Sequence, residues 1–143
     1  MIRGTTAGFT FTLPYSLNKL SSATVTFWQE GYKGTEEYPL PIIKSFKDFS
    51  EFDDSKQLTV TLTAADTKRF TDKLKARVQL VARTREVVDD QDNVIEPSVR
   101  FASRISLITV HPMKDDIIED NPEDIVPSDQ DGYIILDGHV VGV

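Results

Sequence analysis

The residues that could carry catalysis or bind a metal are few and scattered. The chain holds two histidines and no cysteine, which excludes disulfides, thiolate zinc sites and cysteine nucleophiles. His111 precedes Pro112, and His139 follows an Asp-Gly pair, so neither has a second ligand at a metal-binding spacing. No glycine-rich phosphate loop and no nucleophile elbow is present. The sequence therefore predicts a protein that is not an enzyme and holds no cofactor and no metal.

Two acidic segments can be compared with calcium loops. If Gly132 took the sixth position of such a loop, the first and twelfth positions would be Pro127 and Gly138, and neither can supply a ligand. Residues 89–93 read Asp-Asp-Gln-Asp-Asn and could surround a cation. The same composition is typical of a hairpin tip, which is the interpretation we prefer.

Five arginines fall on two segments that alternate like strands. If those strands pair, their arginines share one exposed face, which is either an ordinary solvated surface or a basic patch for an acidic peptide. Nucleic acid is the less suitable ligand, because the sequence pI is near 4.8 and no aromatic residues are interleaved for base stacking. The candidate patch is Arg77, Arg83, Arg85, Arg100 and Arg104.

Charge divides the chain into a body and a tail. All 16 basic residues lie at or before Lys114, where 14 acids leave a net charge of +2. The remainder holds 9 acids and no base. Such asymmetry indicates either an interaction tail or an acidic linker that keeps the chain soluble. No apolar run approaches the ~20 residues of a membrane span, and no signal-peptide core follows Met1.

The body has the periodicity of an all-β domain. Apolar and polar residues alternate at residues 5–13, 23–28, 58–62, 76–83 and 99–110. Two prolines in residues 38–46 predict either an edge strand or an extended connection there. Thr63 and Asp66 have capping-box spacing, which predicts a short helical turn to about Thr71. We expect an immunoglobulin-like antiparallel β-sandwich. Its expected core is Phe11, Phe27, Val60, Val78, Leu80 and Ile105.

The sequence after Lys114 predicts an extended linker followed by a C-terminal segment that forms β-strands. We divide the chain into a sandwich at residues 1–114, an acidic extended linker at 115–131 and an apolar C-terminal tail at 132–143 that forms a hairpin or a strand. The Asp137-Gly138 pair between two apolar runs predicts a β-hairpin, which is too small to be stable alone. It must pack on its own body or on a neighbour, and we predict a neighbour. The expected contact residues are Tyr133, Ile134, Ile135, Leu136, Val140 and Val141.

Three segments carry a family resemblance. They are the opening MIRGTTAGFTFTL, the stretch from Leu20 to Phe27, and the turn from Leu62 to Thr67. Together they resemble small tailed-phage virion proteins, including the N-terminal domain of phage upper-baseplate proteins. The resemblance covers residues 1–110. The long insertion at residues 38–52 departs from it, so it implies a phage particle protein rather than a baseplate protein in particular.

The leading hypothesis is a structural component of a tailed-bacteriophage virion, in the head, neck, tail or baseplate. Such a protein would be made in the host cytoplasm and would form homo-oligomers and contacts with other virion proteins, without nucleic acid or membrane. The alternative is a host-surface or carbohydrate adhesion module that uses Trp28, Tyr32 and Tyr38. A hydrolase is a third hypothesis, which no catalytic set of residues supports.

Overall fold

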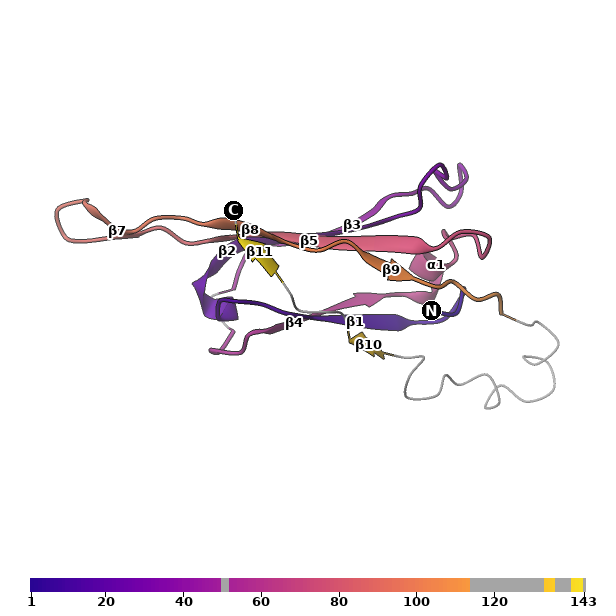
Figure 1. The fold of residues 1–143 in the computed structure, drawn as a ribbon, viewed down its shortest axis with the longest axis horizontal. Coiled ribbons are helices and arrows are strands. Elements are labelled where there is room, and N and C mark those ends of the chain that lie inside the picture. Colours follow the sequence, from indigo (N-terminus) through magenta and orange to yellow (C-terminus); the bar gives the residue numbers. More distant parts are fainter. Residues whose placement is uncertain (50–51, 114–132, 136–139, 143) are drawn as a thin grey trace.

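Two β-sheets pack face to face around one apolar core (Figure 1). The computed structural model describes residues 1–49, 52–113, 133–135 and 140–142, the last two segments as backbone strands. The architecture is all-β with short helical turns, as the alternating sequence pattern predicted. Within these described ranges, no helix is long and apolar enough to cross a bilayer.

The larger sheet is built on two long central strands, β2 (Leu20–Trp28) and β5 (Ala76–Thr84), which pair antiparallel. On one side, β2 pairs with the edge strand β3 (Ile42–Phe46), which confirms the edge position predicted from the prolines. On the other side, β5 pairs with both β8 (Arg100–Ser103) and β9 (Ser106–Ile108). The last strand, β11 (Val140–Gly142), pairs with β8.

The smaller sheet has three strands in the order β10, β1, β4. β1 (Ala7–Thr12) and β4 (Gln57–Leu62) are antiparallel, whereas β10 (Tyr133–Ile135) runs parallel to β1. A short 3₁₀ turn, η1 (Leu17–Lys19), precedes β2, and α1 (Ala64–Thr67) follows β4. A separate pair, β6 (Val87–Val88) and β7 (Val94–Glu96), projects beyond the sheets (Figure 1).

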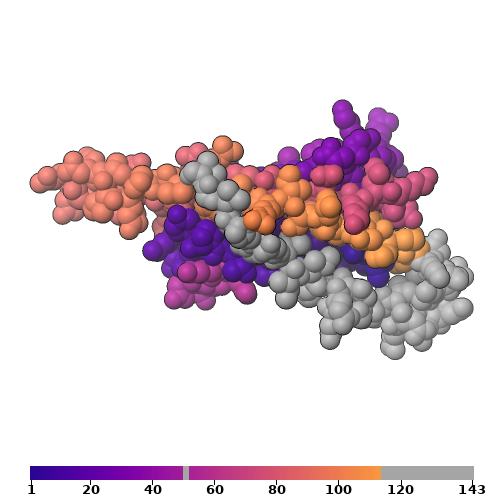
Figure 2. All heavy atoms as spheres, in the orientation of Figure 1, coloured from indigo at the N-terminus to yellow at the C-terminus, as the bar shows by residue number. Residues whose placement is uncertain are grey.

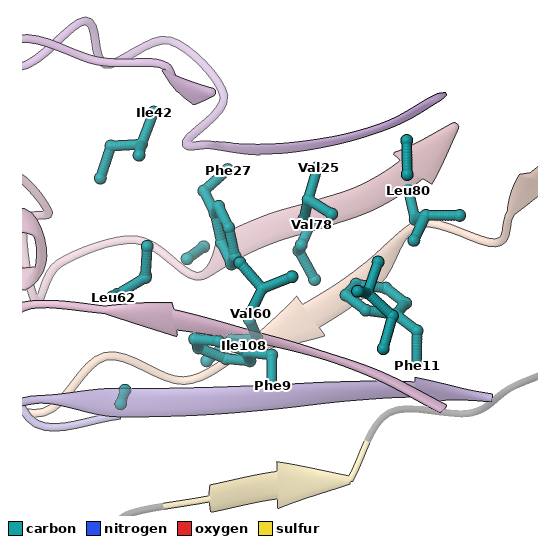
Figure 3. Close-up of a cluster of buried hydrophobic side chains, with 14 of the residues drawn as sticks. Phe9, Phe11, Val25, Phe27, Ile42, Val60, Leu62, Val78, Leu80 and Ile108 are labelled. Carbon is teal, nitrogen blue, oxygen red and sulfur yellow. The ribbon is translucent and has the colours of Figure 1, made fainter. Parts of the chain in front are cut away.

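The core lies between the sheets and is lined by every second residue of their strands (Figure 3). The rings of Phe9 on β1 and Phe27 on β2 meet across the two sheets, with centroids 5.1 Å apart. Five of the six predicted core residues are buried, which confirms the predicted inward faces of their strands. They are Phe11, Phe27, Val60, Val78 and Leu80.

The prediction that Ile105 belongs to the core is wrong, because its side chain is 47% exposed. Between the pairs Val78↔Ser106 and Val81↔Ala102, β5 advances three residues while its neighbour advances four. This extra residue is a bulge, and it reverses which face the following side chains take. The hydroxyl of Ser103 accepts a 2.9 Å hydrogen bond from the Leu80 N–H at this point. Ile108 therefore fills the core instead.

The predicted cap of the helical turn is confirmed. Thr63 Oγ1 accepts from the Asp66 N–H at 3.2 Å, and Asp66 Oδ2 accepts from the Thr63 N–H at 3.0 Å. Lys44 on β3 also donates to Asp66 Oδ2, at 2.9 Å. Burial by itself would raise the pKa of Asp66, but these hydrogen bonds and the nearby ammonium leave the pKa below its usual value. The helix is shorter than predicted, ending at Thr67.

The two tail strands do not pair with each other as the predicted C-terminal hairpin would require. β10 joins the smaller sheet beside β1, and β11 joins the larger sheet beside β8. A pair of three-residue strands gains little from pairing with each other in water, whereas each sheet offers a preformed row of backbone groups. Leu136, His139 and the acidic linker at residues 115–131 lie outside the described residues.

Truncation of Phe27 tests the contact between the sheets. Because its ring is fully buried and meets Phe9 from the opposite sheet, Phe27→Ala should lower the free energy of unfolding by about 3–5 kcal/mol. The control is Ile105→Ala, which removes an exposed side chain and should change it by less than about 0.5 kcal/mol. Chemical denaturation followed by Trp28 fluorescence measures both. Equal effects would contradict the observed facing of these strands.

Replacement of the cap residue tests α1. Thr63→Ala removes the acceptor for the Asp66 N–H and should lower the free energy of unfolding by about 1 kcal/mol. Thr63→Ser keeps the hydroxyl and should recover most of that loss. A Ser variant as unstable as the Ala variant would show that the methyl group, and not the hydrogen bond, matters at this position.

Candidate functional site

The strand edges that receive the tail form the first candidate interaction site. On the smaller sheet, Gly8, Phe9 and Thr10 of β1 face β10 in parallel register. On the larger sheet, Phe101, Ala102 and Ser103 of β8 face β11 in antiparallel register. Strand addition of this kind draws its affinity from main-chain hydrogen bonds and needs no deep pocket. The two edges can therefore bind short extended segments.

One short tail segment reaches the receiving edges of both sheets. Only five peptide units separate Ile135 of β10 from Val140 of β11, and these can span at most about 19 Å. The covalent chain thus requires both edges to lie on the same side of the molecule. β10 and β11 form a clip, one strand in each sheet, that joins the two layers at that side.

The five arginines of the predicted patch do not lie together. Arg83 and Arg100 are directly opposite each other on β5 and β8, and both are exposed. Arg77 lies six residues further along β5, about 20 Å away, and its Nε is 3.9 Å from Glu30 Oε1. The Arg85 guanidinium donates to the Asn18 carbonyl. Arg104 is exposed in the bulge.

The pair Arg83 and Arg100 is the basic centre that the structure does assemble. Opposed like charges on neighbouring strands repel each other. Such a pair favours an anion or an acidic segment nearby. β11 lies beside β8, the strand that carries Arg100. The outer face of β5 and β8 is therefore the part of the predicted patch that suits an acidic partner.

The histidine and the acidic loop have structural roles. The His111 N–H donates to the Met1 carbonyl at 2.8 Å, and Ile2 bridges to His111, so this segment fixes the N-terminus. The Asp89 carboxylate accepts from the N–H groups of Asn93 and Gln91, which lowers the pKa of that carboxyl. Residues 89–93 form the predicted hairpin tip. Among the residues that the structure places, no three potential ligands cluster as a metal site.

The aromatic residues of the adhesion hypothesis are only partly available. Trp28 is half-buried, and its indole N–H donates to Glu30 Oε1 at 3.0 Å. Tyr32 packs against the core. Tyr38 is half-buried in the loop before β3. Each of the three rings is thus only partly exposed to a ligand.

Sequence reasoning missed a projecting arm, residues 86–96. It consists of β6, β7 and the tip between them, and it extends from one end of the molecule (Figure 2). Four large apolar side chains lie exposed on it, namely Val87, Val88, Val94 and Ile95. The available signal was the pair of β-branched runs on either side of the Asp- and Asn-rich tip.

Comparison with known proteins gives no relative: no family model matches the chain, and no curated protein and no solved structure is significantly similar to it. What the fold establishes is a class, an all-β protein of two packed sheets.

Removal of one arginine tests the opposed pair. Arg100→Thr relieves the repulsion with Arg83, so it should raise the free energy of unfolding at low salt by about 0.2–1 kcal/mol. The gain should shrink at high salt, because exposed charges are screened. The control, Arg77→Thr, removes a residue beside Glu30 and should not stabilise. A destabilised Arg100→Thr protein would show that an acidic segment already neutralises the pair.

Proposed function

We propose that this protein is a structural, non-enzymatic component of a tailed-bacteriophage virion, with an immunoglobulin-like sandwich as its body. It belongs to the head, neck, tail or baseplate and assembles with copies of itself and with other virion proteins. The observation that carries the proposal is the tail, whose two strands complete the edges of two different sheets. A tail with this design can complete a neighbour's sheets in the same way.

The reach of the tail supports exchange between copies. The 17 residues 115–131 can span on the order of 50 Å when extended, which exceeds the ~13 Å radius of gyration expected for a body of this size. A neighbour's β1 and β8 offer the same partners in the same register as the chain's own. Pairing energy is then equal in the two arrangements, so linker geometry and local concentration decide between them.

The family resemblance supports the phage assignment. Its three segments provide β1, most of β2, and the junction of β4 with α1. They thus form both layers of the sandwich and the helical turn, and the tail lies outside them. A body that resembles virion proteins, with an added strand-forming tail, fits a part that is repeated on a symmetric scaffold.

Cysteine pairs test the exchange directly, because the natural chain has no cysteine. Ala102 and Val141 are opposite each other in register, at a Cα separation of about 4.5–5.5 Å that suits a disulfide. We would mix the single variants Ala102→Cys and Val141→Cys under oxidising conditions. A disulfide-linked dimer is expected if the tail crosses to a neighbour.

Two controls complete the experiment. Ser45→Cys lies exposed on β3 and out of register with β11, so its mixture with Val141→Cys should give little dimer. The double variant Ala102→Cys, Val141→Cys reports closure within one chain. If only the double variant forms a bond, and that bond is intramolecular, the tail completes its own body and the proposed mode of assembly fails.

A further inference from the structure

Two segments at opposite ends of the molecule carry opposite charge. The arm at one end, residues 86–96, holds five acids and no base: Glu86, Asp89, Asp90, Asp92 and Glu96. At the other end, beyond α1, residues 68–75 hold Lys68, Arg69, Lys73 and Lys75 against one acid, Asp72. Figure 1 shows the arm and α1 at opposite ends of the long axis. The arm and residues 68–75 are therefore two oppositely charged surfaces, and Arg83, Arg85 and Arg100 lie between them at the base of the arm.

The arm is preformed and its sides are uncovered. At the tip, the Asp89 N–H donates to the Asn93 carbonyl at 2.9 Å, and Asp92 takes a left-handed φ of 63°. Val94 and Ile95 are 52% and 61% exposed. A two-stranded ribbon with exposed β-branched side chains is marginally stable alone and prone to association. Such an arm gains stability from a partner that covers its apolar sides and neutralises its acids.

The opposite end offers a groove of about 580 Å³ with matching chemistry. Its charged lining residues are Arg3, Lys68 and Asp72, two bases against one acid, and Tyr32 and Met113 supply apolar surface. The Arg3 Nε donates to the Phe70 carbonyl at 2.8 Å, which holds the guanidinium at the groove. The Gly4 N–H donates to Thr67 Oγ1, so the N-terminal segment is fixed against α1. The groove is thus built by residues that the fold already holds in place.

We propose that the acidic arm of one copy binds the basic groove at the opposite end of the next copy. The occupant is a second copy of this chain, because the chain itself carries both complementary surfaces: an acidic arm with exposed Val and Ile side chains, and a groove with a net positive charge beside the basic residues 68–75. The contact joins two different surfaces, so it is heterologous and leads to a closed ring or an open filament of subunits. This inference rests on the proposed assembly role but uses neither tail strand.

Charge reversal at each end tests the contact in the full chain. The arm variant is Glu86→Lys with Asp90→Lys and Glu96→Lys, which changes the net charge of residues 86–96 from −5 to +1. The groove variant is Lys68→Glu with Lys73→Glu and Lys75→Glu, which changes that of residues 68–75 from +3 to −3; all six positions are exposed. Each variant alone juxtaposes like charges and should weaken self-association at low salt by at least about tenfold. Sedimentation velocity over a range of protein concentrations measures this.

Mixing the two variants is the decisive step. The arm of the first variant is basic and suits the acidic groove of the second, while the second variant's arm still suits the first variant's groove. An equimolar mixture should therefore recover wild-type association at low salt and lose it at high salt. As a control of equal charge change, Asp48→Lys with Asp53→Lys and Asp54→Lys, at exposed positions between β3 and β4, should associate like the wild type.

The outcomes separate this contact from the tail. Wild-type protein that stays monomeric at low salt, or an arm variant that associates normally, overturns the proposal, as does a mixture that fails to recover. A chain with Ile134, Ile135, Val140 and Val141 all changed to proline cannot pair through its tail, because consecutive N–H groups point to opposite sides of a strand. If that chain keeps salt-sensitive association, the arm contact stands whether or not tail exchange occurs.

Discussion

The contact between the two sheets is the interaction on which the structure depends. The chain has no disulfide, so apolar burial must stabilise it. Without β10, the smaller sheet consists of β1 and β4 alone, and an isolated pair of strands is marginal in water. It persists because Phe9, Phe11 and Val60 project from it into the larger sheet's core. The edges, the groove and the arm are all positioned by that packing.

The small size of the second sheet explains why the edges matter. Packing buries the faces of both sheets but leaves their outer strands with unpaired backbone groups, which bind other strands. The chain supplies two strands of its own, β10 and β11, one for each sheet. The arm extends the same principle, since β6 and β7 continue beyond the sheets and pair only with each other in the described part of the chain. Paired and unpaired edges thus define the surfaces that are available for assembly.

Sequence reasoning succeeded where the deciding forces are local. Strict alternation placed Phe27, Val60 and Val78 in the core, and the spacing of Thr63 and Asp66 identified the cap. It failed at Ile105 because the bulge depends on Ser103, which bonds the N–H of Leu80, 23 residues away. The hairpin prediction followed a local turn signal, whereas β10 and β11 pair with strands far away in the sequence. The same limit applies to the arginines, since the register that opposes Arg83 and Arg100 cannot be read from either strand alone.

The two proposed contacts differ in symmetry, and this difference bears on what can be built. If two copies exchange tails reciprocally, each fills the other's edges and the pair closes as a dimer. An arm that binds a groove at the far end of the next copy leaves its own groove open, so the chain of contacts continues until a rotation closes it. The short connection between β10 and β11 requires both tail strands to bind the same acceptor molecule. Tail exchange therefore either joins two copies reciprocally or links each copy to the next one along a row. The arm contact is compatible with an arrangement in which each copy donates its tail to the next copy along a row. The tail contact and the arm contact then both point in the same direction along that row. A molecule with an acidic arm at one end and a basic groove at the other favours that polar arrangement over a closed dimer.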